Sequence, residues 1–195
     1  MPRQVPTPRT VEIPSAEAVA KERERLQYKK KYNRTLRSTI YALLVVLVAT
    51  IFLPVLQVSG TSMEPTLDDG DIILLLKSES FTTGDICGLY WQNKLLLKRV
   101  IGGPGDIIDI DAAGNVTVNG QELDEPYVTD KALGECDITL PYQVPENRYF
   151  VMGDHRSTSV DSRSSVIGCI EKEQIVGRAF LRVYPFDRIS LLLQK

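Results

Sequence analysis

The chain has 195 residues, of which 43% are hydrophobic and 25% are charged, a length that suits one domain with appendages. The net charge of −2 conceals an asymmetry, because residues 1–58 carry 10 Lys/Arg against 4 Asp/Glu whereas residues 59–195 carry 13 against 21. The acidic larger part would be repelled by phosphate, which excludes nucleic acid as a partner, while the basic first part is typical of a segment held beside anionic lipid.

The first 37 residues are predicted to form a basic, partly disordered tail. Residues 1–20 contain four prolines and few large apolar side chains, a composition that favours disorder. Residues 21–37 are a charge run that includes three consecutive lysines, Lys29 to Lys31. Such a run is either the solvated face of a helix or an anchor beside a membrane. Its position directly before an apolar segment favours the anchor.

Residues 38–58 form an apolar run without a charged residue. As a helix of about 21 residues this run would extend about 30 Å, the thickness of the hydrocarbon core of a bilayer. The alternatives are a buried core helix or a cleaved signal peptide. However, a signal peptide has a shorter apolar region than this run and a shorter charged segment before it than residues 1–37. The excess of Lys/Arg before the run predicts a cytoplasmic N-terminus. We therefore expect a single-pass protein of the cell membrane with an extracytoplasmic domain over residues 59–195.

After residue 58 the chain alternates short apolar runs with turn residues, which predicts an antiparallel β domain. Strands are expected over 71–76, 85–91, 95–101, 107–110, 115–118, 148–152 and 174–184, with a helical turn at 172–175. The dipeptides at 92–93 and 119–120 predict tight turns. Residues 122–145 are polar and irregular and are expected to lie on the surface. They belong to a small β extension predicted over about residues 106–147.

Three cysteines, Cys87, Cys136 and Cys169, do not follow any zinc-binding spacing. They are either small, partly buried apolar residues or one disulfide with one free thiol. The sequence predicts no metal site and no organic cofactor.

A serine between glycine and proline, Ser62, is the candidate nucleophile. It lies in Ser59-Gly60-Thr61-Ser62-Met63-Glu64-Pro65, and a serine hydroxyl needs a base to take its proton. The single histidine, His155, offers a Ser–His pair. Lys98 is the better base because it lies in the apolar run 95–101, where burial would lower the pKa of its ammonium group.

Together with Gly153-Asp154-His155-Arg156-Ser157-Thr158-Ser159-Val160-Asp161-Ser162-Arg163, these segments resemble the bacterial type I signal peptidases. Four boxes, residues 59–67, 70–73, 98–106 and 153–163, follow one another in the family's order. The resemblance covers about residues 38–185. It implies a mainly antiparallel β-sheet catalytic domain with one N-terminal transmembrane helix. It also implies a membrane-bound serine endopeptidase that cleaves signal peptides from exported preproteins through an acyl-enzyme intermediate.

The same resemblance implies roles for five residues of the boxes. Ser62 would be the nucleophile and Lys98 the general base. Ser159 matches a serine that orients the lysine by a hydrogen bond. Asp161 and Arg163 match a carboxylate–guanidinium pair that holds the last box, and their alternative is a surface ion pair of small energetic worth.

The oxyanion hole and the substrate pockets are also implied. Where some members place a serine hydroxyl, this chain has Gly60, so the oxyanion would rely on the Ser62 N–H with the Gly60 N–H or a water. Val58, Leu67 and Leu97 match positions that line the subsites, where shallow apolar pockets admit alanine-sized side chains. The alternative for these three residues is plain core.

The resemblance implies preprotein signal peptides, the lipid bilayer and the secretion translocon as partners. A soluble self-cleaving Ser/Lys protease with a DNA-binding domain is one rival, which the apolar run disfavours. An inactive membrane-tethered β module that only binds exported chains is another, which is disfavoured by the presence of Ser62, Lys98, Ser159 and Asp161. His155 departs from the family's usual asparagine and does not occupy a catalytic position.

Overall fold

The computed structural model describes residues 15–193, except for the side chains of residues 49–52. The prediction of disorder for residues 1–14 therefore lies outside the described residues. The chain divides into two compact units, one ending at Val48 and the other beginning at Ala49, and each unit is described by itself.

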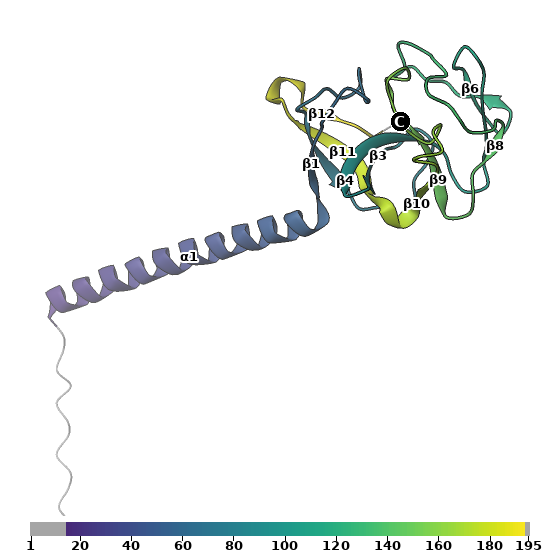
Figure 1. The fold of residues 1–195 in the computed structure, drawn as a ribbon. Coiled ribbons are helices and arrows are strands. Elements are labelled where there is room, and N and C mark those ends of the chain that lie inside the picture. Colours follow the sequence, from purple (N-terminus) through teal and green to yellow (C-terminus); the bar gives the residue numbers. More distant parts are fainter. Residues whose placement is uncertain (1–14, 194–195) are drawn as a thin grey trace, which may run out of the picture. The chain divides into compact units, whose positions relative to one another are not determined.

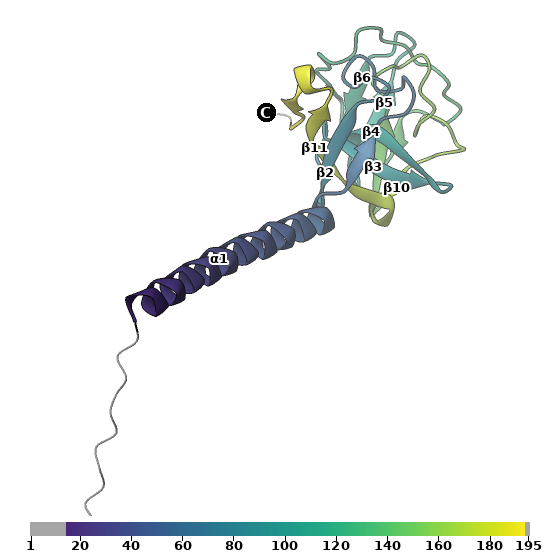
Figure 2. The same cartoon turned by 90° about the vertical axis from the view of Figure 1, so that its left-hand side faces the viewer.

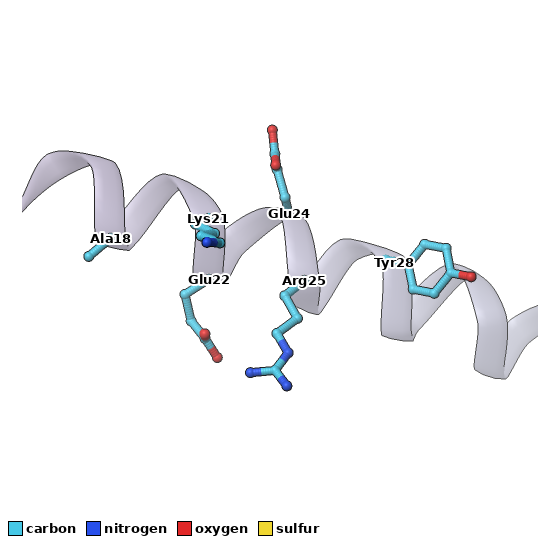
Figure 3. Close-up of a pocket in the computed structure, with 6 residues that line it drawn as sticks. All are labelled: Ala18, Lys21, Glu22, Glu24, Arg25 and Tyr28. Carbon is cyan, nitrogen blue, oxygen red and sulfur yellow. The ribbon is translucent and has the colours of Figure 1, made fainter.

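The first unit is built on α1 (Ala16–Phe52), a helix of 37 residues and thus about 55 Å long. The Ser15 hydroxyl accepts a hydrogen bond from the Ala18 N–H at 3.3 Å and so caps the first turn. The helix therefore begins inside the stretch predicted to be disordered, and the prediction is wrong for residues 16–20. Figure 3 shows the side chains of Ala18, Glu22 and Arg25 on one side of α1 and that of Glu24 on the other.

The apolar run 38–58 changes structure before its end. The helix ends at Phe52, and β1 (Val55–Gln57) follows directly. The Pro54 carbonyl accepts a hydrogen bond from the Leu75 N–H at 2.8 Å, which commits this part of the chain to the sheet. The prediction of a helix up to Val58 is therefore wrong for its last residues. Among the residues that the structure describes, no helix combines the length and the apolar character needed to cross a membrane.

The second unit is mainly antiparallel β, as predicted (Figures 1 and 2). Within the described residues the larger sheet has eight strands in the order β1-β2-β11-β3-β4-β9-β10, with β12 paired to β11. Their bounds are β2 (Ile72–Leu76), β3 (Ile86–Trp91), β4 (Lys94–Gly102), β9 (Arg148–Met152), β10 (Ile170–Glu171), β11 (Ile175–Tyr184) and β12 (Ser190–Leu191). The short 3-10 helix η1 (Lys172–Gln174) precedes β11, and η2 (Phe186–Arg188) follows it.

A smaller sheet lies between β4 and β9 in the chain and has the order β7-β6-β5-β8. Its strands are β5 (Ile107–Ile110), β6 (Val116–Val118), β7 (Gln121–Glu122) and β8 (Tyr142–Gln143). Asn119 and Gly120, both with positive φ, form the two-residue turn between β6 and β7. Gln92 and Asn93 do the same between β3 and β4. In both places the predicted dipeptide forms the turn, and Asn93, Asn119 and Gly120 are of the types that tolerate this conformation.

Phe150 joins the two sheets. Its side chain comes from β9 of the larger sheet, is fully buried and packs in one cluster with Ile108 and Val116 of the smaller sheet. A second cluster includes Val58 and Leu97. The larger sheet therefore shares a continuous apolar contact with the extension.

Replacing Phe150 with alanine is expected to lower the free energy of unfolding by about 3–5 kcal/mol, because it removes a buried ring and leaves a cavity between the sheets. Denaturant unfolding of the purified protein measures the change. Phe186→Ala is the matched control, since Phe186 is 78% exposed and contacts the edge of Tyr184, and it should cost no more than about 1.5 kcal/mol. Equal losses for the two variants would contradict this account of the core.

Candidate active site

Ser62 lies in the loop between β1 and β2, whose two ends are tied together. The Val58 N–H donates to the Asp71 carbonyl at 2.8 Å, and the Gly70 N–H donates to the Val58 carbonyl at 3.0 Å. Ser62 is half-buried, and its carbonyl accepts a hydrogen bond from the His155 N–H at 3.1 Å. Within the described residues its hydroxyl makes no hydrogen bond, so it is free to meet a substrate.

Lys98 comes from the middle of β4 and is only 4% exposed. Its Nζ donates to the Ser159 hydroxyl at 2.8 Å. Burial lowers the pKa of Lys98, because a desolvated ammonium is disfavoured; Asp161 raises this pKa, Arg163 lowers it and Asp154 raises it, with a net lowering. A buried amine with a lowered pKa is suited to accept a proton.

Cys87 is the cross-strand partner of Lys98 in the register of β3 and β4. Burial, and then the nearby Asp85 carboxylate, raise the pKa of Cys87 to about 12. Its thiol therefore stays neutral and adds no charge beside the amine. Cys136 and Cys169 are likewise free thiols, so the structure favours the reading of the three cysteines without a disulfide.

Gly153 brings the Ser62 loop and Ser159 together. A Cβ at this position would lie 2.2 Å from the Ser159 Oγ and 2.5 Å from the Ser62 carbonyl oxygen. Both separations are too short for any side chain, so glycine is required for close approach. Because the Ser159 hydroxyl also binds the Lys98 Nζ, Gly153 is the contact through which three of the predicted site residues meet.

Asp161 and Arg163 are fully buried and paired, in contrast to a surface ion pair. The Asp161 carboxylate accepts hydrogen bonds from the Arg163 Nε and Nη2, each at 2.8 Å, and from the Gly153 N–H at 3.0 Å. Burial raises the pKa of Asp161, but the hydrogen bonds and charge of Arg163 outweigh it and hold this pKa below its usual value. The Arg163 Nη1 also donates to the Leu133 carbonyl at 2.7 Å, which ties the last box to the extension.

Asp154 links three of the predicted boxes. Its carboxylate accepts two hydrogen bonds from Arg99, at 2.8 and 2.6 Å, and one from the Thr66 hydroxyl at 2.6 Å. Arg99 directly follows Lys98, and Thr66 belongs to the Ser62 box. The arginine two residues further on, Arg156, does not pair with Asp154 but with Glu125 of the extension.

The oxyanion donors predicted from the sequence differ in availability. The Gly60 N–H donates to the Asp69 carboxylate at 2.7 Å, so the structure contradicts the expectation that it is free for an oxyanion. The Ser62 N–H makes no backbone hydrogen bond within the described residues. It is therefore the available donor beside the candidate nucleophile.

Two of the three predicted subsite residues lie at a cavity beside Ser62. The cavity is small, about 30 Å³, and Val58 and Leu97 line it. Leu67 is fully buried in the apolar cluster that contains both and is absent from the cavity lining. For Leu67 the structure therefore supports the alternative reading of plain core.

Residues 31–184 match the family described as signal peptidase, peptidase S26. The chain belongs to this family. It is 36% identical over 154 residues to signal peptidase I of Bacillus licheniformis, a match that covers 72% of this chain and 81% of that protein. It is 37% identical over 163 residues to signal peptidase I P of Bacillus subtilis subsp. natto, covering 77% and 87%. A solved signal peptidase I from Enterococcus faecalis V583 is 25% identical, covers 51% of this chain and 96% of that chain, and has a TM-score of 0.44.

Two side chains at the candidate site were not predicted from the sequence. Glu125 is 5% exposed and binds Arg156, and the Tyr127 ring centroid lies 3.8 Å from the Arg99 Cζ. Both come from the polar stretch 122–145, which was expected to lie on the surface. Its composition gives no periodic signal, and the only local hint is an aromatic residue beside a proline.

Replacing Gly153 with alanine is expected to lower kcat/KM for a peptide substrate by about 10²-fold, because the methyl group would push the Ser62 loop away from Ser159 by a distance on the order of 1 Å. Steady-state kinetics of the purified enzyme measure the loss. The control is Gly103→Ala, where the nearest atoms to a new Cβ lie 3.8 Å away. Similar activity of the two variants would show that Gly153 does not set the separation.

Proposed function

We propose that this chain is a membrane-bound serine endopeptidase that removes signal peptides from exported preproteins with a Ser62/Lys98 dyad. The observation that carries the proposal is the buried Lys98 amine, 4% exposed and held by the Ser159 hydroxyl at 2.8 Å. Gly153 contacts both Ser159 and the Ser62 backbone, which brings the nucleophile's loop to the same place. Membership of the signal peptidase family supports the substrate class.

In the acylation step the neutral Lys98 amine takes the proton of the Ser62 hydroxyl while the Ser62 oxygen attacks the carbonyl carbon of the scissile peptide. The resulting oxyanion accepts a hydrogen bond from the Ser62 N–H. When the intermediate collapses, the C–N bond breaks and the protonated Lys98 gives its proton to the leaving amine, the new N-terminus of the mature protein. The signal peptide remains esterified to Ser62.

In the deacylation step Lys98 takes a proton from water, and the water oxygen attacks the ester carbonyl. The second tetrahedral intermediate collapses, Ser62 regains its proton from Lys98, and the signal peptide leaves with a free carboxylate. Ser159 orients the amine in both steps, because its neutral hydroxyl accepts a hydrogen bond from one N–H of the amine. Asp161 and Arg163 act indirectly, by positioning the Ser159 backbone. The Ser159 carbonyl accepts a hydrogen bond from the Arg163 Nη2 at 3.2 Å.

The cavity beside Ser62 supports a preference for small side chains before the cleaved bond. It is about 30 Å³ and has Val58 and Leu97 in its wall, so a methyl group suits it better than a larger side chain. Small residues at this place are typical of signal-peptide cleavage sites.

We further propose that the chain is held at the cell membrane with its N-terminus in the cytoplasm and its catalytic domain outside. The Lys/Arg-rich stretch before the apolar run supports this orientation. The C-terminal edge of the larger sheet also exposes apolar side chains. Phe186, Ile189 and Leu191 are 78, 56 and 66% exposed. Anchoring beside the secretion translocon would raise the concentration of membrane-inserted preproteins at the site.

The dyad predicts that Ser62→Ala and Lys98→Ala each abolish cleavage of a model preprotein while the fold is retained. The wild-type rate should rise with pH, because the amine works as a base only when deprotonated, and should do so below the pH expected for an ordinary lysine, because burial lowers the pKa of Lys98. Ser159→Asp should shift this rise to higher pH, since a carboxylate there would stabilise the ammonium. Preprotein cleavage against pH, with circular dichroism for the fold, makes the measurement.

His155→Ala is the control for the dyad. Within the residues that the structure describes, the buried Nδ1 of His155 has no hydrogen-bond partner, so replacing this side chain breaks no hydrogen bond through that atom and should leave substantial activity. A His155→Ala enzyme as inactive as Ser62→Ala would replace the lysine base with a Ser–His mechanism.

The proposed membrane location predicts that the full chain sediments with membranes and resists extraction by high salt and alkaline carbonate. Protease added outside spheroplasts should digest the domain after Ser59 and spare an epitope placed at the N-terminus. Digestion of that epitope alone would reverse the proposed orientation, and release by carbonate would exclude an integral anchor.

A further inference from the structure

The loop between β7 and β8 places a carboxylate in the interior beside the last box. Glu125 and Arg156 have side chains that are both fully buried, with hydrogen bonds of 2.5 Å from Nη2 to Oε1 and 3.1 Å from Nη1 to Oε2. Burying two charges is costly even when they pair, so such a pair gives little net stability. Both residues make further contacts, Glu125 with Tyr127 and Arg156 with Gly153.

Arg156 makes one further hydrogen bond, and it leads to the site. Its Nε donates to the Gly153 carbonyl at 3.0 Å. Gly153 is the residue whose Cα faces both the Ser159 Oγ and the Ser62 carbonyl at close range. A continuous series of contacts thus runs from Glu125 through Arg156 and Gly153 to the two sides of the dyad.

Tyr127 makes a second connection from the same segment. Its hydroxyl donates to the Glu125 Oε1 at 3.2 Å, and its ring lies over the Arg99 guanidinium at 3.8 Å. Arg99 is the neighbour of Lys98 on β4 and also binds Asp154. The segment therefore contacts one arginine beside the base and another arginine behind Gly153.

We propose that Glu125 is a positioning residue of the peptidase reaction, acting through Arg156 to fix the Gly153 carbonyl and so the separation of Ser62 from Ser159 and Lys98. Tyr127 supports it by orienting the carboxylate and covering Arg99. The inference rests on the proposed function. It assigns to the extension a part in the chemistry, although Glu125 itself touches neither substrate nor reacting atom.

Glu125→Gln is expected to lower kcat and to leave KM nearly unchanged. The amide keeps the size of the side chain but removes the charge that holds Arg156, so we expect the guanidinium to shift together with its hydrogen bond to the Gly153 carbonyl. A displacement of about 1 Å at Gly153 would lower kcat by about 10- to 100-fold. KM should change little, because the cavity lined by Val58 and Leu97 is formed by other segments.

The pH profile gives a second readout. The groups that act on the Lys98 amine are Ser159, Asp161, Arg163 and Asp154, with the neutral Cys87 across the strand pair. If Gly153 moves, water reaches the amine and the desolvation that lowers its pKa is reduced. The pKa of Lys98 would then rise, and the acid limb of the kcat profile would move to higher pH.

The experiment measures kcat, KM and the pH profile of the full chain in detergent with a model preprotein, for wild type, Glu125→Gln, Glu125→Asp and Glu122→Gln. Glu122→Gln is the matched control, since this glutamate lies three residues earlier, is 69% exposed and approaches Lys131 only at 4.0 Å. We expect Glu125→Gln to lose kcat and to shift its acid limb, Glu125→Asp to regain part of both, and Glu122→Gln to resemble wild type.

Three results would overturn the inference. One is an unchanged kcat for Glu125→Gln. Another is a loss of kcat that matches the loss of folded protein, with an unshifted pH profile, which would reduce the pair to a structural role. If Glu125→Gln does not fold, Tyr127→Phe, which removes only the hydrogen bond to Glu125, must lower kcat by about 2- to 10-fold, and an unaltered rate would count against the inference. A wild-type chain that cleaves no preprotein would instead overturn the proposed function.

Discussion

One buried carboxylate, Asp154, holds the site together. It receives Arg99 from β4 and Thr66 from the Ser62 loop, and it follows Gly153 in the last box. These segments are distant in sequence, and the carboxylate joins them alongside the hydrogen bonds from Lys98 to Ser159 and from the His155 N–H to the Ser62 carbonyl. Removing the carboxylate would leave the Arg99 charge buried without a partner, a change that typically costs about 3–5 kcal/mol. The geometry of the candidate site thus depends on an ion pair that has no role in the proposed proton transfer.

Lys98 is buried among charged groups that are themselves paired. Three guanidinium–carboxylate pairs lie in this part of the molecule: Arg99–Asp154, Arg156–Glu125 and Arg163–Asp161. Of these charged groups, Asp161 and Asp154 raise the pKa of Lys98 and Arg163 lowers it, so their effects on the amine oppose one another. This is why desolvation is the largest cause of the lowered pKa of Lys98. A lysine beside an unpaired carboxylate would remain an ammonium ion.

The sequence predicts most of the sheet and the candidate site, because local patterns encode both. Short apolar runs between turn residues gave strands such as β3 and β9 almost to the residue, and the four boxes identified Ser62, Lys98 and Ser159 as one group. What failed depends on distant contacts. The end of α1 is decided by the pairing of Val55–Gln57 with β2. Glu125 is buried because it pairs with Arg156, which lies 31 residues away in the sequence.

The position of β11 in the sheet has a consequence for the order of synthesis. This strand, near the end of the chain, lies between β2 and β3, which are close together in sequence. The larger sheet therefore cannot be completed before β11 has been made, and its pairings are strongly non-local, a property that slows folding. Arg182 of β11 also binds Asp71 at the neck of the Ser62 loop. The Ser62 loop is thus completed only after β11 has been synthesised, so a chain made only as far as β10 does not yet have an assembled candidate site.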